Sequence, residues 1–428
     1  MKTIHVLLVL ILLFQLSVQG QNFSLKESVD YAITNNSDIK MSTYDQLIAK
    51  TKINQQIGTI LPQINASGSL TDNFQSASSL SSKYIMSAGA QLDQKIYDPT
   101  FSAGLKAANF GKTQAALNLE QTKEQIVYSV CRTYYQTLII KKQYDVLNTI
   151  LSFTSETLKA IELKYTNGSA KKLDIDKIKV TYNNTHSQVK QAELNYEQSL
   201  NNLKCQMGIP VDSVIVLTDT LNDNPSEDYI PASDTNYLEN RTDYKLLKVS
   251  LNLQETNKSN FQTGYLPSLS FNANYGYQSS QNEFTLIDDN WDANSSVGLS
   301  LSVPIFDGLQ RHEKVAQSNY EISKAKENIK SAEQTIKVDI SNYTLQHRIA
   351  VDNITNEKAN LSLAEEVLKN TQLAYQQGTE SSYELIQAES SMYEAQNNYF
   401  TTLLNFYYAC IDLEQSKGNL MNFVNTLK

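Results

Sequence analysis

The residues whose side chains could carry out covalent or metal chemistry are few and scattered. The chain has three Cys and four His among its 428 residues. It contains no Gly-rich phosphate loop or nucleophile elbow, and His186, His312 and His347 lack the spacing of metal ligands. We therefore expect no catalysis, no cofactor and no bound metal ion.

Two of the cysteines lie symmetrically about a glycine. Cys131 is 37 residues before Gly168, and Cys205 is 37 residues after it. An antiparallel helical hairpin that turns at Gly168 would bring both to the same height, where an oxidising compartment allows a disulfide. Packed helix axes lie about 8–10 Å apart, so the bond requires both Cβ atoms to point inward. The alternative is two unpaired thiols in the apolar core.

The elements that position these residues are duplicated along the chain. A Tyr-x-x-Gly motif at 165–168 opens a helical run that ends at Gly208, and a second at 375–378 opens a run that ends at Gly418. The motif glycines and the final glycines are both offset by 210 residues. Such regularity predicts two structurally equivalent halves.

The N-terminus has the pattern of a secretory signal peptide. Lys2 precedes the apolar run 6–14, and Val18 and Gly20 fit the small positions of a cleavage site. No Cys follows, so we expect no lipid anchor there. The predicted division is a signal peptide at 1–20, a first repeat at 21–211 with its helical tip at 165–171, a linker at 212–235 and a second repeat at 236–428 with its tip at 375–381.

Composition favours long helices and argues against nucleic acid. The net charge is −9, and no basic patch with interleaved aromatic residues occurs. Only 7 Pro and 14 Gly are present, and long stretches at 100–165 and 309–375 contain no Pro. Each stretch predicts a helix of about 100 Å that returns as a second helix after the tip. A capping box at Ser24–Glu27 begins another helix, expected to reach about Gln56.

Between these helices the pattern of apolar residues changes to the two-residue period of β-strands. Apolar residues alternate with Ser, Asn, Gln and Gly at 64–71, 86–93, 268–277 and 297–305, which predicts two hairpins of membrane-length strands. A half-buried soluble sheet is the alternative, but the polar face has few charges, as in strands between lipid and water. Trp291, Tyr275, Tyr277 and Phe284 would suit an aromatic girdle at the membrane interface or, alternatively, core packing.

Four membrane strands from one chain cannot close a barrel, because lipid does not tolerate open strand edges. The chain must therefore oligomerise, and long hairpins with one polar face would continue the lumen as a helical cylinder. The predicted fold class is mostly α with a β-barrel part, in which each chain contributes two β-hairpins and long antiparallel helical hairpins. This architecture is a conduit.

With these features the sequence resembles the TolC-like outer-membrane efflux protein family. The order and spacing of several short motifs carry the resemblance: the entry helix Leu25–Asn36, Leu-Pro at 61–62 and 266–267, Ile305-Phe-Asp-Gly308, and Tyr375-x-x-Gly378-Thr379 followed by Glu384-Leu385-Ile386-x-Ala388. The resemblance implies a homotrimer, a twelve-stranded outer-membrane barrel in lipid and a periplasmic α-barrel. It also implies an exit duct for a tripartite efflux pump or type I secretion system. The implied partners are a periplasmic adaptor (membrane fusion protein) and an inner-membrane transporter.

The resemblance also assigns candidate site residues at the two tips. The resemblance places an entrance gate at Glu384, Gln387 and Tyr375. The first half offers Asp174 and Asp176 near the same depth as further gate candidates. Gln387 stands where the family carries a second carboxylate, and Glu380 where it carries a base that Lys171 or Lys172 would have to replace. Adaptor contacts would fall on Tyr165, Gly168, Ser169, Gly378 and Thr379. The simpler interpretations are helix-start carboxylates, turn glycines and N-caps.

One other class of protein has long helical hairpins. A periplasmic coiled-coil scaffold or adaptor subunit would share them, but that class does not need two alternating ten-residue β-hairpins in register with the duplication.

Overall fold

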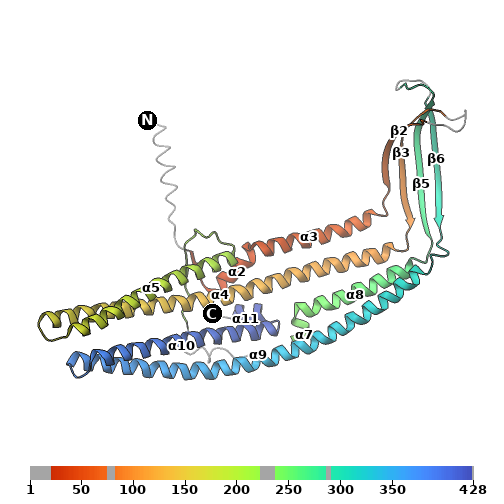
Figure 1. Cartoon of the computed structure of the whole chain (residues 1–428). Coiled ribbons are helices and arrows are strands. Elements are labelled where there is room, and N and C mark those ends of the chain that lie inside the picture. The colour runs from red at the N-terminus through yellow and green to blue at the C-terminus, as the bar shows by residue number, and fades with distance from the viewer. Residues whose placement is uncertain (1–20, 75–81, 222–236, 286–290, 427–428) are drawn as a thin grey trace, which may run out of the picture. The chain divides into compact units, whose positions relative to one another are not determined.

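The computed structural model describes residues 21–74, 82–221, 237–285 and 291–426. The expected signal peptide, and residues 222–235 of the expected linker, lie outside this part of the chain. The chain divides into two compact units (Figure 1). Unit 1 comprises Met1–Ser42, Leu119–Thr242 and Ala332–Lys428, and unit 2 comprises Thr43–Asn118 and Asp243–Ser331. Among the described residues, no helix combines the length and apolar content needed to cross a bilayer.

Unit 2 contains a four-stranded antiparallel sheet that confirms the two predicted β-hairpins. Its strands are β2 (Gln63–Asp72), β3 (Tyr84–Tyr97), β5 (Ser268–Gln281) and β6 (Asp292–Ser302). Their order is β2-β3-β5-β6, so the two hairpins pair with each other through β3 and β5 (Figure 1). Strands β2 and β6 form the edges of this sheet.

The pairing register sorts the alternating residues into rows on opposite faces of the sheet. Residues directly opposite each other on paired strands share a face. One row is apolar across all four strands: Ile64, Leu92, Ala273 and Val297. The adjacent row on the other face is polar across all four strands: Asn65, Gln91, Asn274 and Ser296. The sheet therefore has an apolar face and a polar, nearly uncharged face.

The aromatic residues expected at a membrane interface lie on or beside the strands. Tyr275 and Tyr277 are two residues apart on β5, and their hydroxyl oxygens are 2.9 Å apart. Both side chains are exposed. Phe284 packs edge-on against Tyr84 with ring centroids 5.4 Å apart. Trp291 is partly buried.

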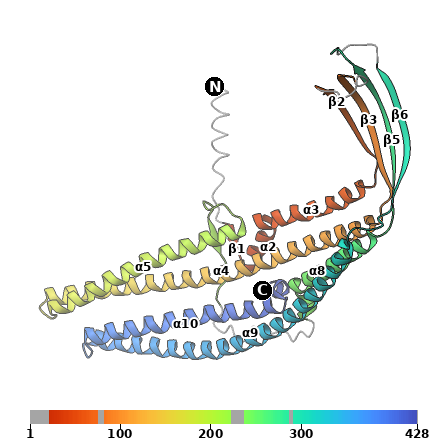
Figure 2. The ribbon, with the colours of Figure 1, turned by 45° about the vertical axis from the view of Figure 1, so that its right-hand side comes forward.

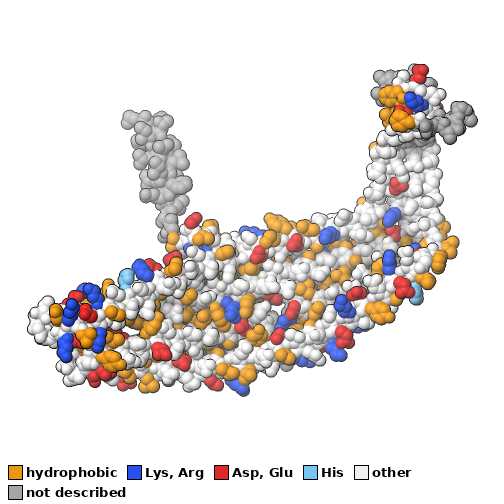
Figure 3. All heavy atoms as spheres, in the orientation of Figure 1, with side chains coloured by type: hydrophobic (Ala, Val, Ile, Leu, Met, Phe, Trp, Pro, Cys, Tyr) orange, Lys and Arg blue, Asp and Glu red, His pale blue; other side chains and the backbone are white. Residues whose placement is uncertain are grey.

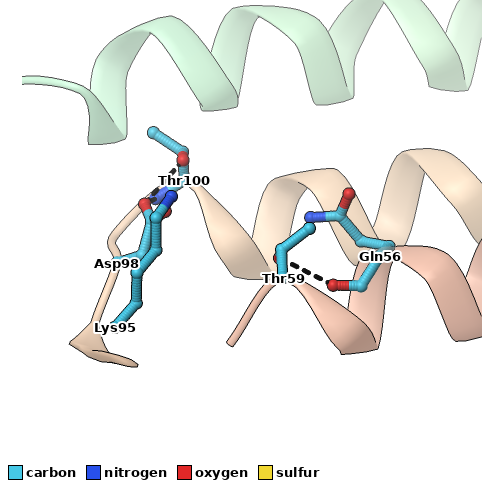
Figure 4. Close-up of polar contacts among 5 residues, drawn as sticks. All are labelled: Gln56, Thr59, Lys95, Asp98 and Thr100. Atoms are coloured by element: carbon cyan, nitrogen blue, oxygen red, sulfur yellow. Dashed lines mark hydrogen bonds and ion pairs between the residues drawn. The ribbon is translucent and has the colours of Figure 1, made fainter. Parts of the chain in front are cut away.

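Short polar contacts fix the junctions between strands and helices in unit 2. After β3, the Asp98 carboxylate accepts hydrogen bonds from the Thr100 backbone N–H (3.0 Å) and hydroxyl (2.6 Å), and pairs with Lys95 Nζ at 2.8 Å (Figure 4). Nearby, the Thr59 hydroxyl donates to the Gln56 carbonyl at the end of α3 (Ser37–Gly58). In the second half, Asp307 accepts from the Arg311 backbone N–H at 3.1 Å. A carboxylate at the start of a helix satisfies free N–H groups, so each aspartate helps to begin a long helix.

The two longest helices each contribute residues to both units. They are α4 (Phe101–Thr166), with 66 residues, and α9 (Gln310–Gln377), with 68. At 1.5 Å per residue each is about 100 Å long, as predicted. Helix α8 (Thr242–Thr263) lies almost wholly in unit 2.

Unit 1 pairs each long helix with a returning helix. Helix α5 (Lys172–Met207) lies antiparallel beside α4, and α10 (Ser382–Ser416) beside α9 (Figures 1 and 2). Short elements complete the unit: α7 (Tyr237–Asn240) and α11 (Leu420–Thr426), and the parallel strands β1 (Gln21–Phe23) and β4 (Ile215–Leu217). The first hydrophobic core joins β1, β4, α2 (Leu25–Asn35), α4, α5, α10 and α11. In this core the fully buried Tyr134 donates to the Phe23 carbonyl at 3.0 Å.

The helix expected from Leu25 to about Gln56 is interrupted. It consists of α2 (Leu25–Asn35) and α3 (Ser37–Gly58), separated by Asn36 at ψ 136°. The Asn36 side chain donates to the Gln206 carbonyl at 2.7 Å and accepts from the Asp38 N–H at 2.8 Å. This buried amide satisfies the backbone where the helix breaks, which helical periodicity alone did not predict. The capping box at Ser24 and Glu27 is present as predicted.

A partly buried polar cluster joins α4 to α10. Arg132 Nη1 lies 2.7 Å from the Asp412 carboxylate, which also accepts from the Tyr128 hydroxyl at 2.8 Å. The Arg132 guanidinium stacks 3.7 Å from the Tyr408 ring centroid. Burial and the neighbouring Asp412 raise the pKa of Tyr128 to about 12. Helix α4 belongs to the first helical hairpin and α10 to the second. This cluster therefore holds the two hairpins together at the level of Arg132 and Asp412.

The symmetric cysteines are not joined. Cys131, Cys205 and Cys410 are free thiols. Cys131 is 1% exposed within the first core, whereas the side chain of Cys205 on α5 is exposed. Two residues equally far from the turn lie at the same height along the hairpin. The rotation of each helix about its axis nevertheless buries one of these side chains and exposes the other.

Candidate entrance gate at the helical tips

The first tip is a tight turn between α4 and α5. Gly168 has a φ of 75°, a conformation that side chains with a Cβ rarely adopt. Its N–H bonds the Tyr165 carbonyl at 2.9 Å, and the Ser169 N–H bonds the Lys164 carbonyl at 2.8 Å. These hydrogen bonds satisfy the last carbonyl groups of α4 and so terminate the helix. The N-cap of α5 is Lys171, whose N–H donates to the Asp174 carboxylate at 3.4 Å.

The second tip repeats this geometry. Gly378 has a φ of 78°, and its N–H bonds the Tyr375 carbonyl at 3.1 Å. The Thr379 hydroxyl donates back to the Ala374 carbonyl at 3.0 Å, so Thr379 closes α9 rather than capping α10. The N-cap of α10 is Ser381, whose hydroxyl accepts from the Glu384 N–H at 3.3 Å. The expected N-caps at Ser169 and Thr379 are therefore wrong by two residues, because each turn is longer than the glycine motif indicated.

Three contacts join the two tips within one chain. The Ser382 hydroxyl at the start of α10 donates to Asp174 Oδ1 near the start of α5 at 3.1 Å. Lys164 Nζ, in the last turn of α4, lies 5.1 Å from the Tyr375 ring centroid. Lys177 Nζ on α5 lies 5.9 Å from the Tyr383 ring centroid on α10. The first hairpin therefore holds the second by one hydrogen bond and two cation–π contacts.

Asp174 is the centre of this arrangement. Ser382 is 8% exposed and Asp174 is half-buried, so the bond between them is only partly shielded from water. Burial and the negative charge of Asp174 raise the pKa of Tyr375 above its ordinary value. The cation over the Tyr375 ring is Lys164, whereas Lys171 and Lys172, the expected substitutes for the missing base, are exposed.

The other expected gate residues are not part of this cluster. Glu384, Gln387 and Asp176 are exposed in the single chain. Acidic and basic side chains are mixed at the tips of the helical hairpins of unit 1 (Figure 3). Among the described residues, no three His, Cys, Asp or Glu side chains are close enough together to hold a metal ion.

The expected adaptor contacts lie at the surface of both turns. Tyr165, Gly168, Ser169, Gly378 and Thr379 are all exposed. Beside them is a groove of about 430 Å³ that sequence analysis did not predict. The exposed side chains of Leu173 and Val180 on α5 and Tyr383 on α10 line it, with Asp176 and Lys177 among them. The only signal in the sequence was the presence of large apolar residues on otherwise polar helix starts.

Sequence analysis also did not predict that Ser382, Lys164 and Lys177 join the two tips. Each is of a type common on solvated helix surfaces, and its role depends on which helix of the other hairpin it faces. Helical periodicity defines a face of one helix, but it does not pair residues 208 positions apart, as in the bond from Ser382 to Asp174.

Comparison with known proteins agrees with this architecture. A family model described as "Outer membrane efflux protein" matches residues 29–208 and 236–419. The outer membrane protein TolC of Escherichia coli is 23% identical over 455 aligned residues, which cover 98% of this chain and 87% of TolC.

Solved structures share the fold at lower identity. The CmeC outer membrane channel of Campylobacter jejuni is 17% identical, with a TM-score of 0.75 over 92% of this chain and 86% of CmeC. The MtrE outer membrane channel of Neisseria gonorrhoeae, in its open state, is 16% identical, with a TM-score of 0.71 over 92% and 89% of the two chains. Because the family model covers most of its length, the chain belongs to the outer membrane efflux protein family, and the outer membrane is its location.

Proposed function

We propose that three copies of this chain form the exit channel of a tripartite efflux pump or type I secretion system. The channel is a passive duct from periplasm to exterior, and a periplasmic adaptor opens it at the helical tips. An inner-membrane transporter supplies the energy, directly or through the adaptor. Family membership favours this role over the alternative of a periplasmic coiled-coil scaffold.

The observation that carries the proposal is the sheet with two unpaired edges. Strands β2 and β6 have 10 and 11 residues, the length of a tilted membrane strand. Every residue of β6 and nearly every residue of β2 is exposed in the single chain. Open edges are not tolerated in lipid, so β6 of one copy must pair with β2 of the next. Three copies with four strands each would close a twelve-stranded barrel.

The two faces of the sheet support the same assignment. The apolar row through Leu92 and Val297 suits acyl chains, and the polar row through Gln91 and Ser296 suits a water-filled lumen. The lumen face has amide and hydroxyl groups rather than a concentration of charge, so it would admit solutes with little discrimination. Selection would then fall to the partners and to the tips.

The contacts between the tips support a closed resting state. The bond from Ser382 to Asp174 and the stacking of Lys164 on Tyr375 hold the second hairpin against the first. All three links are partly exposed and individually weak, so an adaptor of moderate affinity could replace them. The groove lined by Leu173, Val180 and Tyr383 offers the adaptor an apolar contact beside the turns.

Conductance and crosslinking test the two parts of the proposal. Purified protein in a planar bilayer should give a low, stable conductance that rises when the tip contacts are removed. A photoreactive residue at Ser169 or Thr379 should crosslink a periplasmic adaptor in cells, whereas the same probe at exposed Glu394, far along α10, should not. Absence of any conductance rejects the duct, and equal capture from all three positions rejects the tip assignment.

A further inference from the structure

A cavity lies between the two helical hairpins of unit 1, away from the tips. Its volume is about 290 Å³, and residues of α4, α9 and α10 line it. Most of the lining is apolar, with Ile150 and Phe153 from α4, Leu368 from α9 and Met392 from α10. Apolar cavities of about half this volume accept a benzene ring, so the space suits a small organic molecule.

Four polar residues interrupt this apolar lining, and two of them, Glu389 and Gln396 on α10, present hydrogen-bond acceptors. Gln396 is 8% exposed, and its Oε1 atom is buried with no hydrogen-bond partner. Glu389 is a partly buried carboxyl with no basic residue among the described residues that line the cavity. A buried acceptor without a donor is costly, so a ligand that supplies donors would gain binding free energy here.

The spacing of the acceptors defines the shape of a ligand. Glu389 and Gln396 are seven residues apart, which places them on one face of α10 about two turns, or roughly 10 Å, from each other. Met392 lies on the same face between them, and Phe153 of α4 and Leu368 of α9 line the same cavity. A complementary molecule has a donor at each end and an apolar body in the middle.

The charge of Glu389 defines the end that binds there. An ionised carboxylate in an apolar cavity is best satisfied by a cation that also donates hydrogen bonds. We propose that this cavity binds a small organic cation, with its ammonium group on Glu389, an aromatic or aliphatic body against Phe153 and Met392, and a hydroxyl or amide donor on Gln396 Oε1. Such an occupant would bridge the two hairpins, because α4 belongs to one and α10 to the other. The site stands on these residues and does not depend on the channel function.

Protonation of Glu389 makes the proposed binding of a cation depend on pH. Burial raises the pKa of this carboxyl to about 7. The polar residues facing it from the other helices, Thr149 on α4 and Gln372 on α9, do not ionise, and its neighbours on α10 in the cavity, Met392 and Gln396, do not either. A cation requires the ionised form, so its affinity should rise by roughly 90-fold between pH 5 and pH 8 and level off above that.

The test uses tyramine, which has an ammonium group and a phenol hydroxyl at opposite ends of an aromatic ring. Calorimetric titration of the detergent-solubilised full-length protein should show binding in roughly the millimolar range at pH 8, as expected for a ligand of this size. Phenethylamine, which lacks the hydroxyl, should bind more weakly, and 3-(4-hydroxyphenyl)propionate, with the opposite charge, should not bind.

Matched variants assign the binding to the two acceptors. Glu389→Gln should lose most of the tyramine affinity and all of its pH dependence, whereas Glu394→Gln, which removes an exposed carboxylate on the same helix, should change neither. Gln396→Leu should make tyramine and phenethylamine equivalent. A thermal unfolding curve like that of the unmodified protein establishes that each variant is folded. Failure to bind tyramine at pH 8, a flat pH profile, or equal binding by the Glu389→Gln variant would overturn the proposal.

Discussion

Replacing Asp174 by Asn is the sharpest perturbation of the proposed gate. The change removes the charge that accepts the hydrogen bond of Ser382 and lies near Tyr375. A bond to a charged group contributes about 1.5–3 kcal/mol when buried, and partial exposure reduces this to about 1 kcal/mol. If three copies open together, the closed state loses about 3 kcal/mol, which is on the order of 100-fold in the ratio of closed to open channels.

Single-channel recording measures that ratio directly. The matched control is Asp176→Asn, because Asp176 carries the same charge two residues away and is exposed. We expect the Asp174 variant to open on the order of 100-fold more often and the control to behave as the unmodified channel. Equal effects of both variants would show that net charge at the tip, and not the bond to Ser382, holds the gate.

A double-mutant cycle separates this bond from other roles of Asp174. Ser382→Ala removes the donor alone, so it should open the channel about as much as the change at Asp174. Because the two residues share one contact, the double variant should open little more than either single variant. Additive effects would contradict the assignment.

The remaining predictions concern the long helices and the tips that form the proposed gate. Gly378→Ala should destabilise the second tip by about 1–2 kcal/mol, because φ is 78° there, and hydrogen exchange should detect it. Gly111→Ala in the interior of α4 should instead stabilise its helix by up to about 1 kcal/mol, and neither new methyl group would meet another atom within 4 Å. Asp412→Asn should lower the free energy of unfolding by about 2 kcal/mol in a denaturant titration, because Arg132 would lose its anionic partner. An unchanged free energy of unfolding would mean that packing alone, and not this ion pair, links α4 to α10. In the native protein a maleimide should label Cys205 and spare the two buried cysteines, so three labelled thiols would contradict the described core.

The elements of this fold were predictable because their patterns are local. Alternation across β5 and β6 followed from a period of two, and the ends of the helices at Gly208 and Gly418 followed from the glycines themselves. The break at Asn36 was missed because its cause is a hydrogen bond to Gln206, 170 residues away. Regular periodicity on both sides of the break hid it.

The site was less predictable than the fold. Resemblance pointed to Tyr375, and the matching depth of the first half pointed to Asp174. The structure brings the charge of Asp174 near the ring of Tyr375. The partners Lys164 and Ser382 could not be predicted, because cation–π contacts and hydrogen bonds between hairpins depend on how the helices are rotated about their axes. The same rotation separates Cys131 from Cys205 despite their symmetric spacing.

The central claim is that copies of this chain close into a trimer through the open strand edges. Native mass spectrometry of the protein extracted from outer membranes in mild detergent measures the number of chains directly. The claim predicts a complex of three chains that dissociates when an edge residue of β6, such as Leu299, is replaced by Pro, which cannot donate to a neighbouring strand. A stable monomer or dimer from the unmodified protein would contradict it.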